Sequence, residues 1–120
     1  KSIPALALNT DTSAITAIGN DFSFDQIFSR QIESLGQEGD VAIGITTSGK
    51  SFNVLNALKL AKKKKIKSIL LTKKNLKNEK KLKQITNLIL GVPGSETARI
   101  QELHILIGHL LCSALDEVIS

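Results

Sequence analysis

The sequence predicts an α/β fold, a three-layer sandwich in which a mainly parallel sheet lies between two layers of helices. Short apolar runs alternate along the chain with stretches of helical spacing, an order typical of βαβ units. The apolar runs are also continuous rather than alternating with polar residues, as expected for strands that are buried on both faces. With 120 residues, 42% of them hydrophobic, we expect a single domain over residues 1–120.

The first part of the chain is expected to hold two strands and a helix. Ile3–Leu8 is an apolar run that predicts a buried strand, and Thr10–Asn20 is expected to be a loop with at most a short helical turn. Phe24–Leu35 has apolar side chains at helical spacing, and Gly36 ends that pattern. Val41–Ile45, an apolar run with β-branched residues, predicts the second strand.

The middle of the chain predicts a helix and a third strand. Ser51 suits the N-cap of a helix that runs to about Lys65. Ile66–Thr72 is apolar and β-branched and predicts a strand. Lys73–Gln84 is polar and basic, so a loop or a short helix is expected there.

The last part of the chain predicts a fourth strand and a long helix. Ile85–Val92 is the strand, ended by a Pro-Gly pair. The helix runs from Thr97 to about Val118 and is apolar around most of its circumference. Because such a helix is normally covered on several sides, we expect another subunit to cover it.

The positive net charge of +5 is concentrated in one stretch. Twelve of the 16 Lys and Arg residues lie between Lys59 and Lys83, with Glu79 the only acid among them. These twelve are all lysines, and the stretch has no aromatic residue to stack on a base, so solvated helix ends are favoured over a nucleic-acid surface. No nucleic-acid partner is therefore expected.

Other features of the composition bear on location and completeness. No apolar run is long enough to span a membrane. The only cysteine, Cys112, cannot form an internal disulfide, which fits a reduced, cytoplasmic setting. The chain has no methionine, not even at position 1. We therefore expect a longer protein in which part of the active site lies upstream.

A hydroxyl-rich loop follows the second predicted strand and precedes the helix that starts near Phe52. Its hydroxyl residues surround Gly49 and are Thr46, Thr47, Ser48 and Ser51. A helix N-terminus with converging hydroxyls and amides forms a cradle for an anion, and phosphate is the expected ligand. The alternative is an ordinary Ser/Thr-rich N-cap turn. The segment is not a Walker loop, because the spaced glycines of that motif are missing.

Two further groups of polar residues stand out. Asn20 and Asp21 follow Gly19 and could bind sugar hydroxyls, although an Asx turn that caps the next helix is the simpler interpretation. Gln101 and His109 are eight residues apart on the last helix, about 12 Å of rise and near one face. A histidine there can act as a base or metal ligand, but on an apolar helix it is more often a core residue. His104, rotated away from both, is expected at the surface or an interface.

Three segments in this order resemble the bacterial phosphoheptose isomerases, a family of the sugar-isomerase (SIS) domain superfamily with a flavodoxin-like fold. They are residues 19–30 (Gly-Asn-Asp-Phe-Ser-Phe-Asp-Gln-Ile-Phe-Ser-Arg), 44–51 (Gly-Ile-Thr-Thr-Ser-Gly-Lys-Ser) and 99–104 (Arg-Ile-Gln-Glu-Leu-His), together with His109. The resemblance implies conversion of sedoheptulose 7-phosphate to D-glycero-D-manno-heptose 7-phosphate, for lipopolysaccharide or other surface glycans. It also implies a homotetramer and a zinc ion in each subunit.

The resemblance also assigns roles to residues. It implies substrate binding by Asn20, Asp21, Thr46, Thr47, Ser48, Ser51 and Gln101. Gln101 and His109 match the residues of the family that take part in metal binding or proton transfer. The family's N-terminal helices, its Gly-Asn-Gly-Gly-Ser loop, and a His and Glu that complete the site have no counterpart here. The chain is therefore expected to lack these helices and the first strand.

Two other functions stay open at this point. Some SIS relatives are binding modules without activity, which bind a replication initiator protein or sense sugar phosphates. Others are isomerases of different sugar phosphates, such as arabinose 5-phosphate. The presence of both Gln101 and His109 favours an enzyme.

Overall fold

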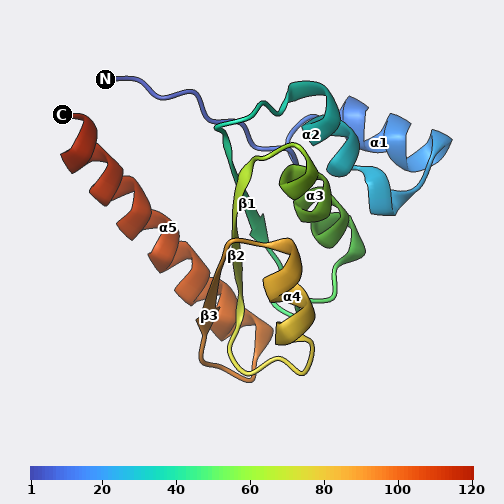
Figure 1. Ribbon diagram of the computed structural model, residues 1–120. Coiled ribbons are helices and arrows are strands. Elements are labelled where there is room, and N and C mark those ends of the chain that lie inside the picture. Colours follow the sequence, from blue (N-terminus) through green and yellow to red (C-terminus); the bar gives the residue numbers. More distant parts are fainter.

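A parallel sheet of three strands forms the centre of the molecule, as the computed structural model of residues 1–120 shows (Figure 1). The strands are β1 (Val41–Ile45), β2 (Lys67–Lys73) and β3 (Leu88–Val92), and they lie in the order β1-β2-β3. Ile43 is paired with Ile69, and Ile69 with Leu88. The predicted α/β class with a parallel sheet is thus confirmed.

Helices lie on both faces of this sheet. The connections between the strands are α3 (Phe52–Lys63) and α4 (Glu79–Ile85), and both lie on one face (Figure 1). This follows from the strand order, because two right-handed crossovers that advance in the same direction place their helices on the same side. The long α5 (Thr97–Ile119) crosses the opposite face. The three layers are therefore helix, sheet and helix, as predicted.

The segment before β1 packs on the outer side of α3. It comprises α1 (Thr12–Asp21), the short 3-10 helix η1 (Phe24–Gln26) and α2 (Ser29–Leu35). Where α2 meets α3, Ile32 belongs to a buried apolar cluster with Ala57, Ala61 and Ile66. A second cluster joins α3, α4 and β2 through Leu55, Leu58, Leu70 and Leu82. The core therefore lies on the α3 and α4 side of the sheet.

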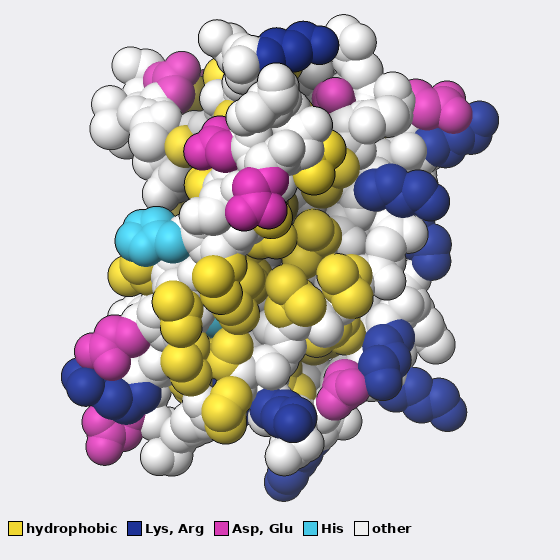
Figure 2. Space-filling model, turned by 90° about the vertical axis from the view of Figure 1, so that its left-hand side faces the viewer, with side chains coloured by type: hydrophobic (Ala, Val, Ile, Leu, Met, Phe, Trp, Pro, Cys, Tyr) yellow, Lys and Arg dark blue, Asp and Glu magenta, His cyan; other side chains and the backbone are white.

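The other face of the sheet is only partly covered. Ile100 and His104 are the only buried residues of α5, and both lie near its start. Large apolar side chains of β1 and of the rest of α5 are at least half exposed: Val41, Ile43, Ile45, Ile105, Leu106, Leu110, Leu115 and Val118. We call these eight residues the apolar face, and Figure 2 shows apolar side chains gathered on this side of the molecule.

No helix is both long enough and apolar enough to cross a bilayer.

The strand predicted at Ile3–Leu8 is wrong. These residues form no strand, and all but Leu8 are exposed. A run of β-branched and apolar residues becomes a strand only where a neighbouring strand accepts and donates its backbone hydrogen bonds. Here β1 is hydrogen-bonded only to β2, and Ile3–Leu8 is not paired with the free edge of β1.

Three other boundaries also differ from the prediction. Thr10–Asn20 is mainly helix, because the Asp11 carboxylate caps α1 by accepting from the Ala14 amide at 3.0 Å. Phe24–Leu35 is split into two helices, and the Asp25 carbonyl in the first of them accepts from the Asn56 side chain. The fourth predicted strand begins later, at Leu88, because α4 continues to Ile85.

Candidate functional site

The hydroxyl loop, residues 46–51, lies between the carboxyl end of β1 and the start of α3. Thr46 is 5% exposed, and its amide donates to the Leu71 carbonyl of the neighbouring strand at 3.0 Å. Its hydroxyl lies 2.8 Å from that of Ser51. Ser48 is exposed at the tip and accepts from the Lys50 amide, while Thr47 is half-buried. One end of the loop is thus fixed to the sheet, and its tip faces solvent.

Ser51 occupies the N-cap position of α3 as predicted, but its side chain does not cap the helix. Its hydroxyl is paired with Thr46 instead. The first turn of this twelve-residue helix therefore has no acceptor from its N-cap side chain and no acidic residue, and only Asn53 Oδ1 accepts there, from the adjacent Val54 amide at 2.8 Å. Free amides and the positive end of the helix dipole favour an anion at this position, and the exposed Lys50 adds positive charge.

Gly49 gives the loop its shape. Its φ is +66°, in the left-handed region, and a Cβ atom there would lie 2.4 Å from Leu76 Cδ1. Its carbonyl accepts from the Asn78 side chain at 2.9 Å. Only glycine fits such a position without strain, so the segment before α4 holds the loop in one conformation.

Asn20 and Asp21 lie in the last turn of α1 and not in a turn of their own. The Asn20 amide donates to the Asp21 carboxylate at 2.9 Å, and both side chains are exposed. The alternative interpretation, an Asx turn that caps the next helix, is wrong, because that helix begins after Ser23 without any side-chain cap. No hydrogen bond joins this pair to the hydroxyl loop.

Arg30 lies beside this pair and was not singled out from the sequence. Its guanidinium stacks on the ring of Phe22 at 3.8 Å. Arg30 and Asp21 also line a hollow of about 330 Å³ between α1 and α2. The position of Arg30 at the end of the segment 19–30 was the only signal for it in the sequence.

Gln101 and His109 both lie on α5, on the other face of the sheet, and both side chains are exposed. The alternative in which His109 is a core residue is wrong, because the helix diverges from the sheet before it reaches this residue. No three residues of His, Cys, Asp or Glu come together anywhere to hold a metal. The chain thus offers two candidate zinc donors, fewer than the three protein ligands of a catalytic zinc site.

His104 is the histidine that lies in the core. It is 5% exposed, its Nε2 lies 3.1 Å from the Thr72 carbonyl oxygen, and its Nδ1 is buried without a partner. The expected surface position is wrong, because His104 follows Ile100 by one turn and shares its face toward the sheet. Helical phase alone could not identify this face, since the apolar residues surround most of the helix.

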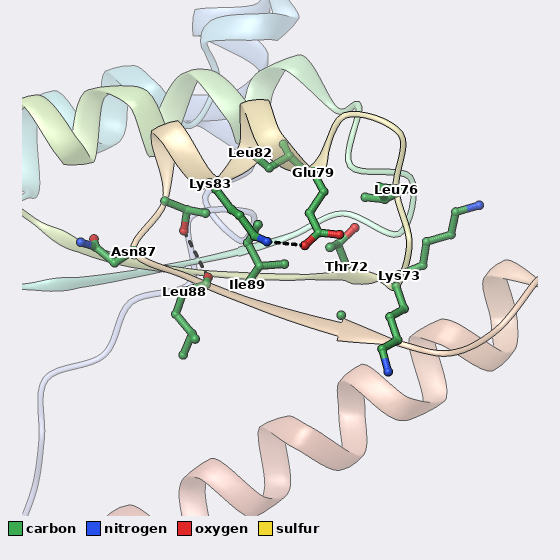
Figure 3. Close-up of a pocket in the computed structure, with 12 residues that line it drawn as sticks. Thr72, Lys73, Leu76, Glu79, Leu82, Lys83, Asn87, Leu88 and Ile89 are labelled. Atoms are coloured by element: carbon green, nitrogen blue, oxygen red, sulfur yellow. Dashed lines mark hydrogen bonds and ion pairs between the residues drawn. The ribbon is translucent and has the colours of Figure 1, made fainter.

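A separate hollow of about 500 Å³ lies between α4 and the edge strand β3. Glu79 and Lys83 of α4 form an ion pair of 2.8 Å above it, and Thr72 contributes to its wall (Figure 3). Lys73 and Lys74 also line this hollow. None of the residues predicted for the site belongs to it, so the hollow is distinct from the hydroxyl loop.

The lysine stretch has structural roles in two places. The Lys64 ammonium donates to the carbonyls of Ile32 and Glu33 at the end of α2. Lys62 donates in the same way to the Gln84 carbonyl in α4. Donors at the last carbonyls of a helix stabilise it, and these contacts agree with the interpretation of the stretch as helix ends.

Comparisons with known proteins point to one family. The SIS domain family matches residues 2–73. The phosphoheptose isomerase of Nitratiruptor sp. is 53% identical over 98% of this chain and 61% of its own length. That of Sulfurimonas denitrificans is 49% identical, over 98% of this chain and 59% of its own length.

Solved structures agree with these matches. The structure of phosphoheptose isomerase GmhA from Neisseria gonorrhoeae superposes with a TM-score of 0.83 at 50% identity, over 92% of this chain and 61% of that one. A phosphoheptose isomerase from Francisella tularensis superposes with a TM-score of 0.86 at 42% identity, over 95% and 60%. The chain thus spans about three fifths of the length of these relatives. On the match of its sequence and fold, the chain belongs to the SIS domain family.

Proposed function

We propose that the protein is an aldose–ketose isomerase that converts sedoheptulose 7-phosphate to D-glycero-D-manno-heptose 7-phosphate. The observation that carries this proposal is the uncapped N-terminus of α3 behind the hydroxyl loop, in a chain whose relatives are named phosphoheptose isomerases. The chain covers only part of those relatives, so the activity is proposed for the native protein as a whole.

In this proposal the hydroxyl loop binds the phosphate group. Thr46, Thr47, Ser48 and Ser51 supply hydroxyl donors, and the first amides of α3 add backbone donors. Asn20 and Asp21 present an amide and a carboxylate at the surface for sugar hydroxyls, and these two groups are hydrogen-bonded to each other. Binding the phosphate tightly holds the reactive end of the sugar in place, which accelerates the reaction by orientation.

The chemical step moves a proton between C1 and C2 through an enediol. It needs a base, an acid and a group that polarises the carbonyl, and proton transfer of this kind contributes about 10²–10⁴-fold to the rate. His109 is the proposed acid or base from this chain, and Gln101 the proposed donor to the substrate oxygen. Both are exposed, so their partners in the reaction would come from residues outside this chain or from another subunit.

Zinc and the homotetramer belong to the same proposal. Gln101 and His109 supply two donors and do not complete a zinc site by themselves, so no step is assigned to a metal here. The apolar face supports association, because a patch of this kind is unusual on a monomer. A cytoplasmic location and a role in lipopolysaccharide precursor synthesis are consistent with the free Cys112 and with the relatives.

The first test is turnover of sedoheptulose 7-phosphate by the native protein, with and without added zinc. We expect heptose phosphate to form, and we expect Ser51→Ala to raise KM, because a phosphate donor is lost while its partner Thr46 remains. Ser113→Ala, an exposed change on α5, is the matched control. Arabinose 5-phosphate serves as the competing substrate, and preference for it would replace the substrate proposed here.

A binding module without activity would give a different result. The protein would then bind sedoheptulose 7-phosphate through the same loop but release it unchanged at every zinc concentration. That outcome would exclude the isomerase while retaining the phosphate site.

A further inference from the structure

A single hydrogen bond attaches α5 to the sheet. It joins His104 Nε2 to the Thr72 carbonyl oxygen at 3.1 Å. No other hydrogen bond or ion pair links α5 to the sheet, since its one ion pair, between Arg99 and Glu102, stays within the helix. Only Ile100 joins His104 in being buried, so the helix is held near its start.

Thr72 connects this attachment to the hydroxyl loop. It is the residue after Leu71, whose carbonyl accepts from the Thr46 amide at 3.0 Å. Side chains of a strand alternate between the two faces, and the Thr72 side chain lies on the face opposite α5. There, a Cβ atom on Gly49 would lie 3.5 Å from Thr72 Oγ1. Thr72 thus faces the loop with its side chain, whose buried hydroxyl has no hydrogen-bond partner, and binds α5 through its carbonyl.

The hydrogen-bonding chemistry of His104 indicates that the bond to the Thr72 carbonyl is the reason for a histidine at this position. A carbonyl only accepts, so Nε2 carries the proton and Nδ1 is left as an acceptor. This Nδ1 is buried without a partner, which disfavours the folded state. An apolar side chain of similar size would avoid that cost, but it would not bond to Thr72.

We infer that His104 is a positioning residue that sets the place of α5 relative to the hydroxyl loop. It fixes the helix against sliding and rotation, so that Gln101 and His109 keep their distance from the phosphate held by the loop. The inference rests on the proposed function. A shift of about 1 Å in reacting groups can cost about 100-fold in rate, which makes such a fixed point significant.

Two substitutions in the native protein separate positioning from other roles. His104→Gln keeps an N–H donor at about the reach of Nε2, whereas His104→Leu keeps an apolar volume without a donor. For His104→Leu we expect kcat to fall by about 10–100-fold, with KM almost unchanged because the loop is intact. His104→Gln restores kcat to near the native value. Ser113→Ala, exposed on the same helix, is the control.

Amide hydrogen exchange gives a second readout that does not depend on activity. Exchange in the first half of α5 is expected to accelerate in His104→Leu and to stay slow in His104→Gln. His104→Met provides a second apolar variant if His104→Leu does not fold.

Three outcomes test the positioning role of His104. Normal kcat and exchange in a folded His104→Leu or His104→Met protein would overturn the inference. Equal loss of kcat in His104→Gln would also overturn it, since that pattern requires the imidazole itself. If the native protein shows no turnover, the proposed function fails, and hydrogen exchange still tests the attachment of α5.

Discussion

At the scale of single residues, the hydroxyl loop depends on Gly49. Its positive φ and the close approach of Leu76 both exclude a side chain. The loop in turn leaves Ser51 paired with Thr46 and the helix start open. A glycine that shapes the backbone is therefore as important for the phosphate site as the hydroxyls that would touch the ligand.

Gly49→Ala is expected to destabilise the protein by about 1–3 kcal/mol, from left-handed strain and overpacking against Leu76. The free energy of unfolding in urea measures this change. Gly108→Ala is the control, because nothing lies within 4 Å of its Cβ position on α5. Because alanine has a higher helix propensity than glycine, Gly108→Ala is expected to stabilise the protein by about 0.5–1 kcal/mol. Equal effects of the two changes would contradict this account of the loop.

At the scale of elements, helix ends are completed by side chains from distant segments. Lys64, just after α3, donates to two carbonyls at the end of α2. This contact joins two helices that already pack through Ile32 and Ala61. Sequence alone could only describe the lysine stretch as solvated, because the partner carbonyls lie about thirty residues away.

Lys64→Met is expected to cost about 0.5–1.5 kcal/mol of stability through the lost hydrogen bonds to the α2 carbonyls. Amides of α2 should exchange faster as the helix end frays. Lys63→Met removes a neighbouring exposed lysine that has no such bond, and little change is expected there. If both variants unfold at the same urea concentration as the native protein, the cap contributes nothing measurable.

At the scale of the whole molecule, the two faces of the sheet differ. One is filled by α3 and α4, and the other is covered only where Ile100 and His104 meet it. The exposed apolar face extends from β1 onto α5 (Figure 2). Apolar surface of this kind is the usual driving force for association.

Replacing Leu106 and Leu110 with Glu is expected to lower the oligomeric state, measured by sedimentation velocity. Both residues are more than half exposed within one chain, so the change removes few contacts inside the protein. Lys80→Glu, on α4 and the opposite layer, should leave the oligomer unchanged. An unaltered sedimentation coefficient in the double variant would show that this part of the apolar face is not an interface.

The sequence by itself determined the α/β class, the three strands that exist, the long last helix and the position of the hydroxyl loop. These features depend on local patterns, namely apolar runs, helical spacing and a glycine among hydroxyl residues. Such patterns can be recognised within short stretches of sequence. The resemblance of the sequence to a family also identified four candidate site residues, Asn20, Asp21, Gln101 and His109. Their roles stay proposals.

The tertiary structure alone decided what Ile3–Leu8 becomes, which histidine is buried and what the Ser51 hydroxyl contacts. A strand needs a neighbour to share its hydrogen bonds, and Ile3–Leu8 is paired with no strand of the sheet. His104 rather than His109 is buried because α5 meets the sheet only near its start. The first two outcomes depend on contacts between residues far apart in the chain, which no local pattern encodes. The short-range Ser51–Thr46 contact depends on the conformation of the loop, which the distant segment before α4 holds at Gly49.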